Sequence, residues 1–238
     1  MKLSIIIPVF NEKRTIKEII DKIIILKNIK KEIIIVDDGS TDGTKNILKK
    51  LNYKEIRKII FLKKNLGKGA AIRAAKNYIT GEIVIIQDAD LEYDPQDYHK
   101  FIKIYLESKA KVIYGSRYLG KKKYNSNNKF WLNFRVFGNY FLTKYSNFIN
   151  NQKLTDAHTC YKSFRSDIYK KIKLQENDFA FCAEITTKIS NEKIDIIEVP
   201  ISYNSRSYSQ GKKITLKDAF RAIYVVMKYK LKKNNNLF

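Results

Sequence analysis

Short runs of β-branched residues alternate with amphipathic stretches in the first half of the chain, and this alternation constrains the fold more than any other feature. We expect five strands, over residues 3–9, 32–36, 56–62, 83–87 and 111–114, with helices over 12–26, 42–51, 67–79 and 95–107. The strands are almost continuous Ile and Val, which indicates burial on both faces. The sequence therefore predicts an α/β fold, with a mostly parallel sheet that carries helices on both faces.

The second half has strand-like pieces near 159–164 and 194–201 and helices around Ala183 and Leu216. Two helical stretches carry apolar stripes at spacings of three and four residues, interleaved with Lys and Arg. These stripes are Phe130, Phe134, Phe137, Phe141, Tyr145 and Phe148 in the first, and Leu216, Phe220, Ile223, Tyr224, Met227 and Leu231 in the second. Each stripe can lie in a membrane interface or pack onto the sheet, and the sequence leaves both arrangements open.

The composition limits the class of protein. With 238 residues, of which 44% are hydrophobic, the chain can bury a core, which excludes a disordered protein or a disulfide-stapled mini-protein. The 47 Lys and Arg against 24 Asp and Glu give a net charge of +23, which favours anionic partners such as phosphates, nucleic acid or an anionic membrane. Lys, Ile and Asn are abundant almost everywhere, so the charge alone selects none of these partners.

The cysteines and the apolar stretches of the sequence indicate in which cellular compartment the protein is expected. Cys160 and Cys182 are too few for a disulfide framework, so a reducing compartment is expected. The apolar run 3–10 is followed at once by Asn11 and Glu12, which indicates a buried strand rather than a signal peptide. No stretch reaches the roughly 18 apolar residues that a spanning helix needs, so membrane contact is expected to be peripheral.

Polar loops follow three of the expected strands. In an open parallel sheet, ligands collect at the carboxyl ends of the strands, where these loops would converge. Asp and Ser also cap helices and Gly makes turns, so a structural role competes with binding for any one loop. Convergence of all three favours a binding site formed by Pro8-Val9-Phe10-Asn11-Glu12, Asp37-Asp38-Gly39-Ser40-Thr41-Asp42 and Asp88-Ala89-Asp90-Leu91-Glu92.

The Asp88-Ala89-Asp90 triplet has the spacing of a metal site. In extended backbone, alternate residues point to the same side, so both carboxylates would face one ligand. Hard oxygen ligands suit Mg²⁺ or Mn²⁺, and such an ion typically takes one or two protein carboxylates together with substrate phosphates. The triplet therefore predicts a divalent cation that bridges a diphosphate to the protein.

These motifs resemble those of the family 2 glycosyltransferases of the GT-A fold. Within that family the chain is most similar to the polyprenyl-phosphate sugar synthases, such as dolichyl-phosphate mannose synthase. The resemblance extends from Met1 to about Lys230. It rests on the three loops together with Asn65-Leu66-Gly67-Lys68-Gly69, Asp94-Pro95, Gly115-Ser116-Arg117, Glu198-Val199-Pro200-Ile201, Arg206 and Gly211-Lys212-Lys213-Ile214.

The resemblance implies a donor site. Pro8, Phe10 and Glu12 would line the nucleotide pocket, and Asp38 would accept a hydrogen bond from the base. A carboxylate can accept from uracil or guanine, so both UDP and GDP stay open.

The resemblance also implies the metal ligands and the cations of the donor site. Asp88, Ala89 and Asp90 would contact the donor, with both aspartates on the cation and Glu92 as third ligand, where mannose synthases often have Gln. Arg206 and Lys212 match residues that close over the donor diphosphate, although solvated surface cations are the alternative.

The resemblance further implies an acceptor site. Arg117 and Arg135 match or approximate arginines that bind the acceptor phosphate, and a guanidinium suits phosphate geometry. Asp156 corresponds to an acidic position near the acceptor, and it is the best candidate for a base if the acceptor is a hydroxyl. The adjacent His158 can titrate near neutrality, but a packing or hydrogen-bonding role is the simpler interpretation.

We therefore expect an inverting glycosyltransferase that moves a hexose from a UDP or GDP sugar to a polyprenyl phosphate at the cytoplasmic membrane face. A family 2 enzyme with a hydroxyl acceptor is the enzymatic alternative. A nucleic-acid-binding protein is suggested only by the charge and leaves the acidic loops unexplained. One domain is expected over 1–232, with a nucleotide-sugar half (1–117) and an acceptor half (118–232), an exposed loop at 119–128 and a frayed tail at 233–238.

Overall fold

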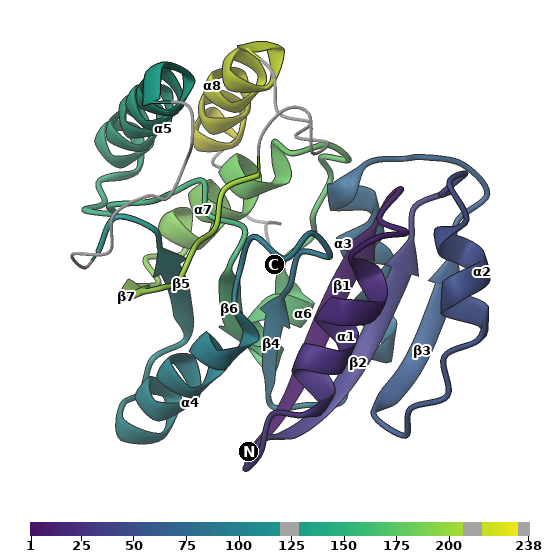
Figure 1. The fold of residues 1–238 in the computed structure, drawn as a ribbon. Helices are drawn as coiled ribbons and strands as arrows, with labels where there is room; N and C mark the ends of the chain where they lie inside the picture. The colour runs from purple at the N-terminus through teal and green to yellow at the C-terminus, as the bar shows by residue number, and fades with distance from the viewer. Residues whose placement is uncertain (120–128, 207–215, 233–238) are drawn as a thin grey trace.

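A single seven-stranded sheet runs through the molecule (Figure 1). The computed structural model describes residues 1–119, 129–206 and 216–232. The strands are β1 (Lys2–Val9), β2 (Lys30–Asp37), β3 (Ile56–Phe61), β4 (Ile83–Ile86), β5 (Val112–Ser116), β6 (Lys162–Arg165) and β7 (Ile196–Pro200). Their order is β3-β2-β1-β4-β6-β5-β7, and only β6 runs antiparallel to its neighbours.

Helices cover both faces of this sheet. They are α1 (Ile16–Ile24), α2 (Thr44–Lys49), α3 (Lys68–Ala75), α4 (Tyr98–Glu107), α5 (Lys129–Asn150), α6 (Ser166–Lys171), α7 (Phe181–Asn191) and α8 (Leu216–Leu231), with short 3₁₀ turns at Lys76–Tyr78 and Pro95–Asp97. Side chains of α1, α2 and α4 belong to one hydrophobic cluster, and those of α3, α6 and α7 to a second. Successive residues of β1 alternate between the clusters, with Ile5 and Ile7 in the first and Ile6 in the second, as burial on both faces requires.

The predicted α/β class is confirmed, and all five strands expected in the first half are present within a few residues. The helix expected from residue 12 begins only at Ile16, because Asn11 has a positive φ of 54° and Glu12 opens a turn instead. The strand-like pieces of the second half are β6 and β7, both part of the main sheet. Helix α6 was not predicted. Residues 120–128, most of the expected loop, and the tail 233–238 lie outside the described residues.

Helices α5 and α8 lie side by side in a further layer, away from β1–β3 (Figure 1). Both contact α7 through a third cluster, which includes Ala222, Val225 and Tyr229 of α8. Within its described part, α5 turns polar side chains inward, because Thr143, Ser146 and Asn150 are all buried. Of the described members of its aromatic stripe, Phe137, Phe141 and Phe148 face outward, with Phe148 85% exposed, whereas Tyr145 packs against the third cluster. The three exposed side chains therefore do not pack onto the sheet.

A buried carboxylate ties the amino ends of the strands together. Glu32, on β2, accepts hydrogen bonds from the Ser4 hydroxyl at 2.6 Å and from the Thr80 amide at 2.7 Å, and it pairs with the Lys2 ammonium. Burial alone would raise the pKa of Glu32, but the hydrogen bonds from Lys2, Ser4 and Thr80 outweigh it and lower the pKa to about 2. The ionised form therefore contributes to stability.

We expect Glu32→Gln to lower the free energy of unfolding by about 1–3 kcal/mol, because the amide cannot accept at both positions and the Lys2 ammonium loses its partner. Since the folded pKa lies below the unfolded one, the contribution of Glu32 is complete above about pH 4.5 and is lost as the pH falls toward 2. Urea denaturation at pH 7 and pH 3 measures both effects. Glu18→Gln, at an exposed ion pair on α1, is the matched control and should change stability by less than about 0.5 kcal/mol.

Candidate functional site

The loops that follow β1 and β2 are joined to each other by hydrogen bonds. The amide of Asn11 donates to the Ser40 hydroxyl at 2.9 Å, and the Asn11 side chain accepts from the amide of Thr41 at 2.8 Å. The amide of Glu12 donates to the Thr44 hydroxyl at 3.0 Å. The carboxyl edge of the sheet is thus a rigid platform, and of the predicted pocket residues Pro8 is buried in β1 whereas Phe10 and Glu12 are partly exposed beyond it.

Asp38 organises the loop that precedes α3. Its buried carboxylate accepts from the amides of Leu66 and Gly67, each at 2.8 Å. Gly67 has φ +100°, and a Cβ there would lie 2.4 Å from the carbonyl oxygen of Asn177, so only glycine fits. Each carboxylate oxygen keeps lone pairs beyond these two bonds, so hydrogen bonding to a base stays a prediction for Asp38.

The predicted acidic residues lie together with two cations that come from distant parts of the chain. Asp88 forms an ion pair with Lys68 at the start of α3. Arg206 donates to both carboxylate oxygens of Glu12 at 3.0 Å and to Asp90 at 3.1 Å. Arg206 therefore lies among the predicted acidic residues and links the loop after β1 to the loop after β4, and its contact with a donor diphosphate stays a prediction.

Negative charge exceeds positive charge at this point. Burial, then the nearby carboxylates Asp88 and Glu92, raise the pKa of Asp90 well above its ordinary value, although Arg206 opposes them. The four carboxylates Glu12, Asp88, Asp90 and Glu92 face two cations, which leaves a formal charge of −2. The Nε–H of Arg206 is buried and has no hydrogen-bond partner among the described residues. Hard oxygen donors with two unbalanced negative charges suit a divalent cation, which could in turn take phosphate oxygens of a substrate.

Glu92, predicted as a metal ligand, also accepts hydrogen bonds from the segment that contains Tyr203 and Arg206. One carboxylate oxygen accepts from the Tyr203 hydroxyl at 2.8 Å and the other from the amide of Arg206 at 2.8 Å. In the described part of the chain, no three acidic, His or Cys side chains converge as a ready-made metal cage. Ligation by Asp88 and Asp90 with substrate oxygens fits this arrangement better than a three-carboxylate site, and the role of Glu92 as third ligand stays a prediction.

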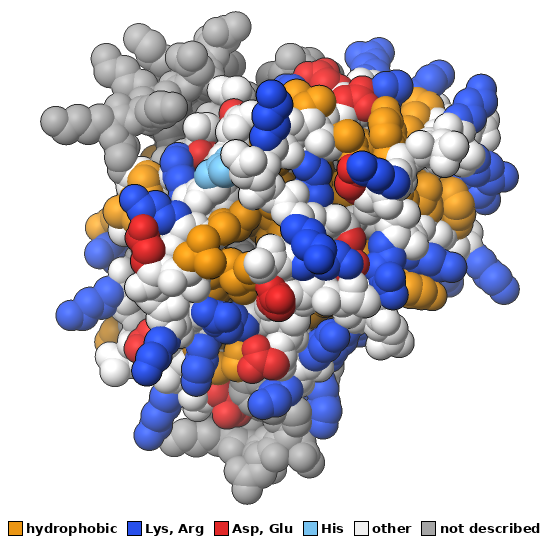
Figure 2. All heavy atoms as spheres, turned by 90° about the horizontal axis from the view of Figure 1, so that it is seen from below, with side chains coloured by type: hydrophobic (Ala, Val, Ile, Leu, Met, Phe, Trp, Pro, Cys, Tyr) orange, Lys and Arg blue, Asp and Glu red, His pale blue; other side chains and the backbone are white. Residues whose placement is uncertain are grey.

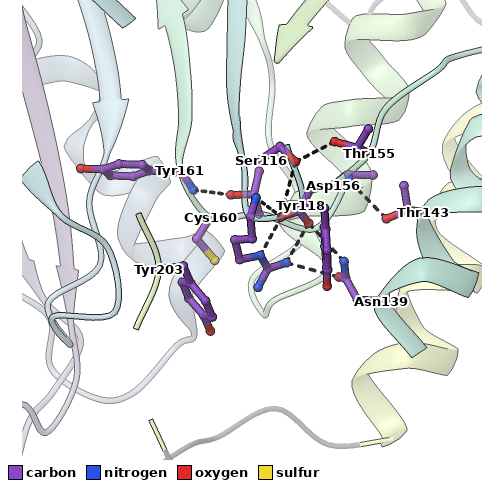
Figure 3. Close-up of polar contacts among 12 residues, drawn as sticks. Ser116, Tyr118, Asn139, Thr143, Thr155, Asp156, Cys160, Tyr161 and Tyr203 are labelled. Atoms are coloured by element: carbon purple, nitrogen blue, oxygen red, sulfur yellow. Dashed lines mark hydrogen bonds and ion pairs between the residues drawn. The ribbon is translucent and has the colours of Figure 1, made fainter. Parts of the chain in front are cut away.

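A second cluster surrounds Arg117, directly after β5 (Figure 3). The guanidinium donates to Asp156 through Nε at 2.6 Å and through Nη2 at 2.7 Å, and the amide of Arg117 donates to the same carboxylate at 3.1 Å. Asn139 of α5 accepts from Nη2 at 3.3 Å and donates to Asp156 at 3.2 Å. The ring of Tyr203 lies 5.2 Å from the guanidinium, so Tyr203 touches both clusters. The structure therefore brings Arg117 and Asp156 together, and their role in binding the acceptor stays a prediction.

The electrostatics of this pair argue against a proton-accepting Asp156. Burial alone would raise the pKa of Asp156, but Arg117 and Asn139 outweigh it and lower the pKa below its ordinary value. The side chain is fully buried at 0% exposure. Burial, and then Lys162, lower the pKa of His158 to about 4, so this imidazole is neutral at pH 7 and the expectation of titration near neutrality is not supported. Neither group has the properties of a general base for a hydroxyl.

Two of the predicted site residues, Lys212 and the side chain of Arg135, lie outside the described residues. Conversely, sequence reasoning gave no separate role to Lys68, Asn139 or Tyr203. Lys68 stands in the quoted Gly67-Lys68-Gly69 motif, which was a usable signal, whereas Asn139 and Tyr203 have no motif and are brought in by the tertiary fold.

Residues 4–173 match the family model described as "Glycosyl transferase family 2", which is more than half of the chain. The chain belongs to glycosyl transferase family 2. A dolichol-phosphate mannosyltransferase of Pyrococcus furiosus is 27% identical over 96% of this family 2 chain and 64% of its own length. A UDP-N-acetylglucosamine–dolichyl-phosphate N-acetylglucosaminyltransferase of Methanococcus voltae is 28% identical over 97% of both chains. A dodecaprenyl-phosphate galacturonate synthase of Rhizobium johnstonii is 25% identical over 89% of this chain.

The family 2 chain spans 64% of the Pyrococcus relative and 62% of the Rhizobium relative. Among solved structures, glucosyl-3-phosphoglycerate synthase of Mycobacterium tuberculosis, with Mn²⁺, UDP and phosphoglyceric acid, superposes with a TM-score of 0.71 at 15% identity and covers 98% of this chain and 78% of its own. Mannosyl-3-phosphoglycerate synthase of Rubrobacter xylanophilus has a TM-score of 0.70 at 16% identity, over 98% and 74%. The fold is thus GT-A, and the resemblance to polyprenyl-phosphate sugar transferases is confirmed.

None of the helices in the described part of this family 2 chain has both the length and the apolarity required to cross a bilayer.

We expect Lys68→Met to lower the free energy of unfolding by about 3 kcal/mol, because it leaves the partly buried Asp88 carboxylate without its ion partner. The double variant Lys68→Met/Asp88→Asn removes both charges and should regain part of that loss, with a coupling free energy of about 0.5–3 kcal/mol in a double-mutant cycle. Denaturant unfolding of the four proteins measures it. Lys17→Met, at an exposed ion pair on α1, is the control; equal losses for Lys17 and Lys68 variants would contradict a structural pair at the site.

Proposed function

We propose that this family 2 enzyme is an inverting glycosyltransferase that moves a hexose, of the mannose or glucose type, from a nucleotide diphosphate sugar to a polyprenyl phosphate. The observation that carries the proposal is the ion pair of the buried Asp156 carboxylate with Arg117, which lowers the pKa of Asp156 and leaves it a poor proton acceptor. Three relatives with 25–28% identity are named for dolichol, dodecaprenyl or dolichyl phosphate, which supports the same class of acceptor.

The acceptor decides whether the site needs a base. A hydroxyl must lose its proton during attack, whereas a phosphate monoester has a second pKa near 6 and is largely dianionic at neutral pH. Among the described residues, the Arg117 site offers a guanidinium and no carboxylate free to take a proton, since Asp156 is held by Arg117 and Asn139. A guanidinium donor without a base supports a phosphate acceptor, because a phosphate needs no proton removed before it attacks.

The donor site has the charge that a metal-bound diphosphate requires. Asp88 and Asp90 would hold Mg²⁺ or Mn²⁺, which would neutralise the charge that develops on the departing nucleoside diphosphate. Arg206, bonded to Glu12 and Asp90, stands at the same place with a spare Nε–H for a phosphate oxygen. Pro8, Phe10, Glu12 and Asp38 would receive the nucleoside, which we take to be UDP or GDP.

The outer face of α5 and α8 fits an anionic lipid surface. Among the residues whose side chains the structure describes, eight of the thirteen exposed large hydrophobic ones lie on these two helices, namely Phe137, Tyr140, Phe141, Phe148, Phe220, Tyr224, Met227 and Leu231. The exposed cations Lys144 and Lys217 flank them, which gives the pairing of apolar and basic groups that interfacial helices use. A polyprenyl phosphate stays in the bilayer, so the enzyme must reach it there.

The remaining charge is dispersed. On the face seen in Figure 2, the described Lys and Arg side chains are scattered, with Asp and Glu among them, rather than forming one stripe. We therefore propose no nucleic-acid partner. Both cysteines are free thiols, which agrees with peripheral attachment at the cytoplasmic face of the membrane.

The function is tested by incubating the protein with Mn²⁺, a panel of UDP and GDP sugars and a short polyprenyl phosphate. We expect a lipid-linked sugar that is absent when the phosphate is replaced by the free polyprenol. Asp88→Ala/Asp90→Ala should abolish turnover and weaken Mn²⁺-dependent binding of the nucleoside diphosphate at least ten-fold in calorimetry, whereas Asp195→Asn, at an exposed aspartate, should leave both unchanged. Transfer to a hydroxyl acceptor but not to the phosphate, or undiminished donor binding in the double variant, would contradict the proposal.

The lipid surface is tested by co-sedimentation with vesicles of phosphatidylcholine, with and without phosphatidylglycerol. Phe141→Glu/Phe148→Glu should reduce binding to the anionic vesicles at least ten-fold, since each phenylalanine loses its insertion into the interface. Leu106→Glu is the matched control, because Leu106 is 69% exposed but lies on α4. Equal binding by the double variant and the control would exclude this face as the membrane contact.

A further inference from the structure

Glu198, on β7, accepts hydrogen bonds from the turn that contains Asp156. One carboxylate oxygen accepts from the amide of Thr155 at 2.7 Å and from its hydroxyl at 3.0 Å, and the other accepts from the amide of Asp156 at 2.9 Å. The backbone of Glu198 is fixed in turn, because β7 pairs in parallel with β5, with Glu198 opposite Tyr114. One carboxylate thus determines where two consecutive residues of this turn lie.

The same turn is held to β5 from the other side. The hydroxyls of Thr155 and Ser116 lie 2.6 Å apart, and the Ser116 hydroxyl also accepts from the amides of Tyr118 and Leu119 at 3.1 and 3.2 Å (Figure 3). Arg117 lies between these contacts and gives both its amide and its guanidinium to Asp156. A continuous set of hydrogen bonds therefore leads from Glu198, through Asp156, to the guanidinium.

The negative charge of Glu198 excludes a direct contact between this carboxylate and a bound anion. Arg117, Asp156 and Glu198 together carry one net negative charge, so a second carboxylate weakens the attraction for a phosphate. Its charge is used instead to accept from backbone N–H groups, and such charge-assisted hydrogen bonds are stronger than neutral ones. The benefit is geometric, since a misplacement of about 1 Å in a positioned group can cost about a hundred-fold in rate.

We propose that Glu198 is a positioning residue, which fixes the Asp156 turn and thereby aims the Arg117 guanidinium at the acceptor phosphate. The inference rests on the proposed function for its kinetic consequence, but not for its structural one. The Nη1 group of Arg117 makes no hydrogen bond with the described residues, so it is the donor left for the acceptor once Nε and Nη2 are held.

Glu198→Gln tests the proposal, because glutamine keeps the shape but presents an N–H to one of the amides that the carboxylate accepts from. The structural readout is the ¹⁵N NMR signal of the Arg117 Nε–H, assigned by its loss in Arg117→Lys and protected from exchange by Asp156. We expect this signal to broaden or disappear in Glu198→Gln. The kinetic readout is kcat/KM for a short polyprenyl phosphate, which should fall at least ten-fold, while KM for the donor sugar changes less than two-fold.

Glu32→Gln is the matched control, since Glu32 also accepts from a hydroxyl and a backbone amide but lies at the opposite end of the strands. It should lose stability and leave both readouts unchanged. Thr155→Val, which removes the hydroxyl contacts with Glu198 and Ser116 but keeps both backbone amides on Glu198, is a milder second variant if Glu198→Gln folds poorly. It should shift the Nε–H signal in the same direction.

The outcomes separate the two proposals. An unchanged Arg117 signal in a folded Glu198→Gln protein would overturn the positioning role, whatever the kinetics. Loss of the signal with unchanged acceptor kinetics would retain the structural link and overturn the assignment of Arg117 to the acceptor. An equal rise in KM for donor and acceptor would show a general disturbance of the site and would also overturn the inference.

Discussion

Repulsion among carboxylates at the carboxyl edge of the sheet is the interaction on which the rest of the site depends. Parallel strands bring the loops after β1 and β4 to one edge, and with them Glu12, Asp88, Asp90 and Glu92. Such a group is tolerated in partial burial only if cations enter it. Lys68 comes from the start of α3 and Arg206 from the segment after β7, so that charge balance connects the first half of the chain to its last third.

The sequence predicts the strands whose pattern of apolar residues shows that they are buried. Continuous Ile and Val runs identify β1, β2 and β4, because strands buried on both faces have no polar alternation to obscure them. The edge strand β3 differs, because it keeps Arg57 and Lys58 exposed. The position of β6 was not predictable, since Lys162–Arg165 is mostly polar by sequence and owes its place between β4 and β5 to long-range pairing. Helix α6 is not predicted for a related reason, because its six residues are too few to show a helical spacing of apolar residues.

The site was predictable where a residue follows a strand or belongs to a recognisable motif, as Asp88, Asp90 and Arg117 do. It was not predictable where a side chain acts through a partner remote in sequence. Nothing near Asp156 in the sequence indicates that Arg117, 39 positions earlier, holds its carboxylate and so lowers its pKa. For the same reason Asp156 was compatible with a role as base until the pairing was known, and the pairing removes the property that such a role requires.

Helix α5 joins the two surfaces that a lipid-phosphate enzyme has to bring together. An aqueous helix normally buries its aromatic residues, but α5 buries Thr143, Ser146 and Asn150 and exposes Phe141 and Phe148. Its inner polar face supplies Asn139 to the Arg117–Asp156 pair, and its Thr143 hydroxyl accepts from the amide of Ala157 at 3.3 Å. Under the proposed function, a helix inverted in this way would have the bilayer on one side and the Arg117 guanidinium on the other, separated by about one helix diameter of roughly 10 Å. A lipid phosphate that protrudes a short distance from the interface would then meet Arg117 without leaving its membrane.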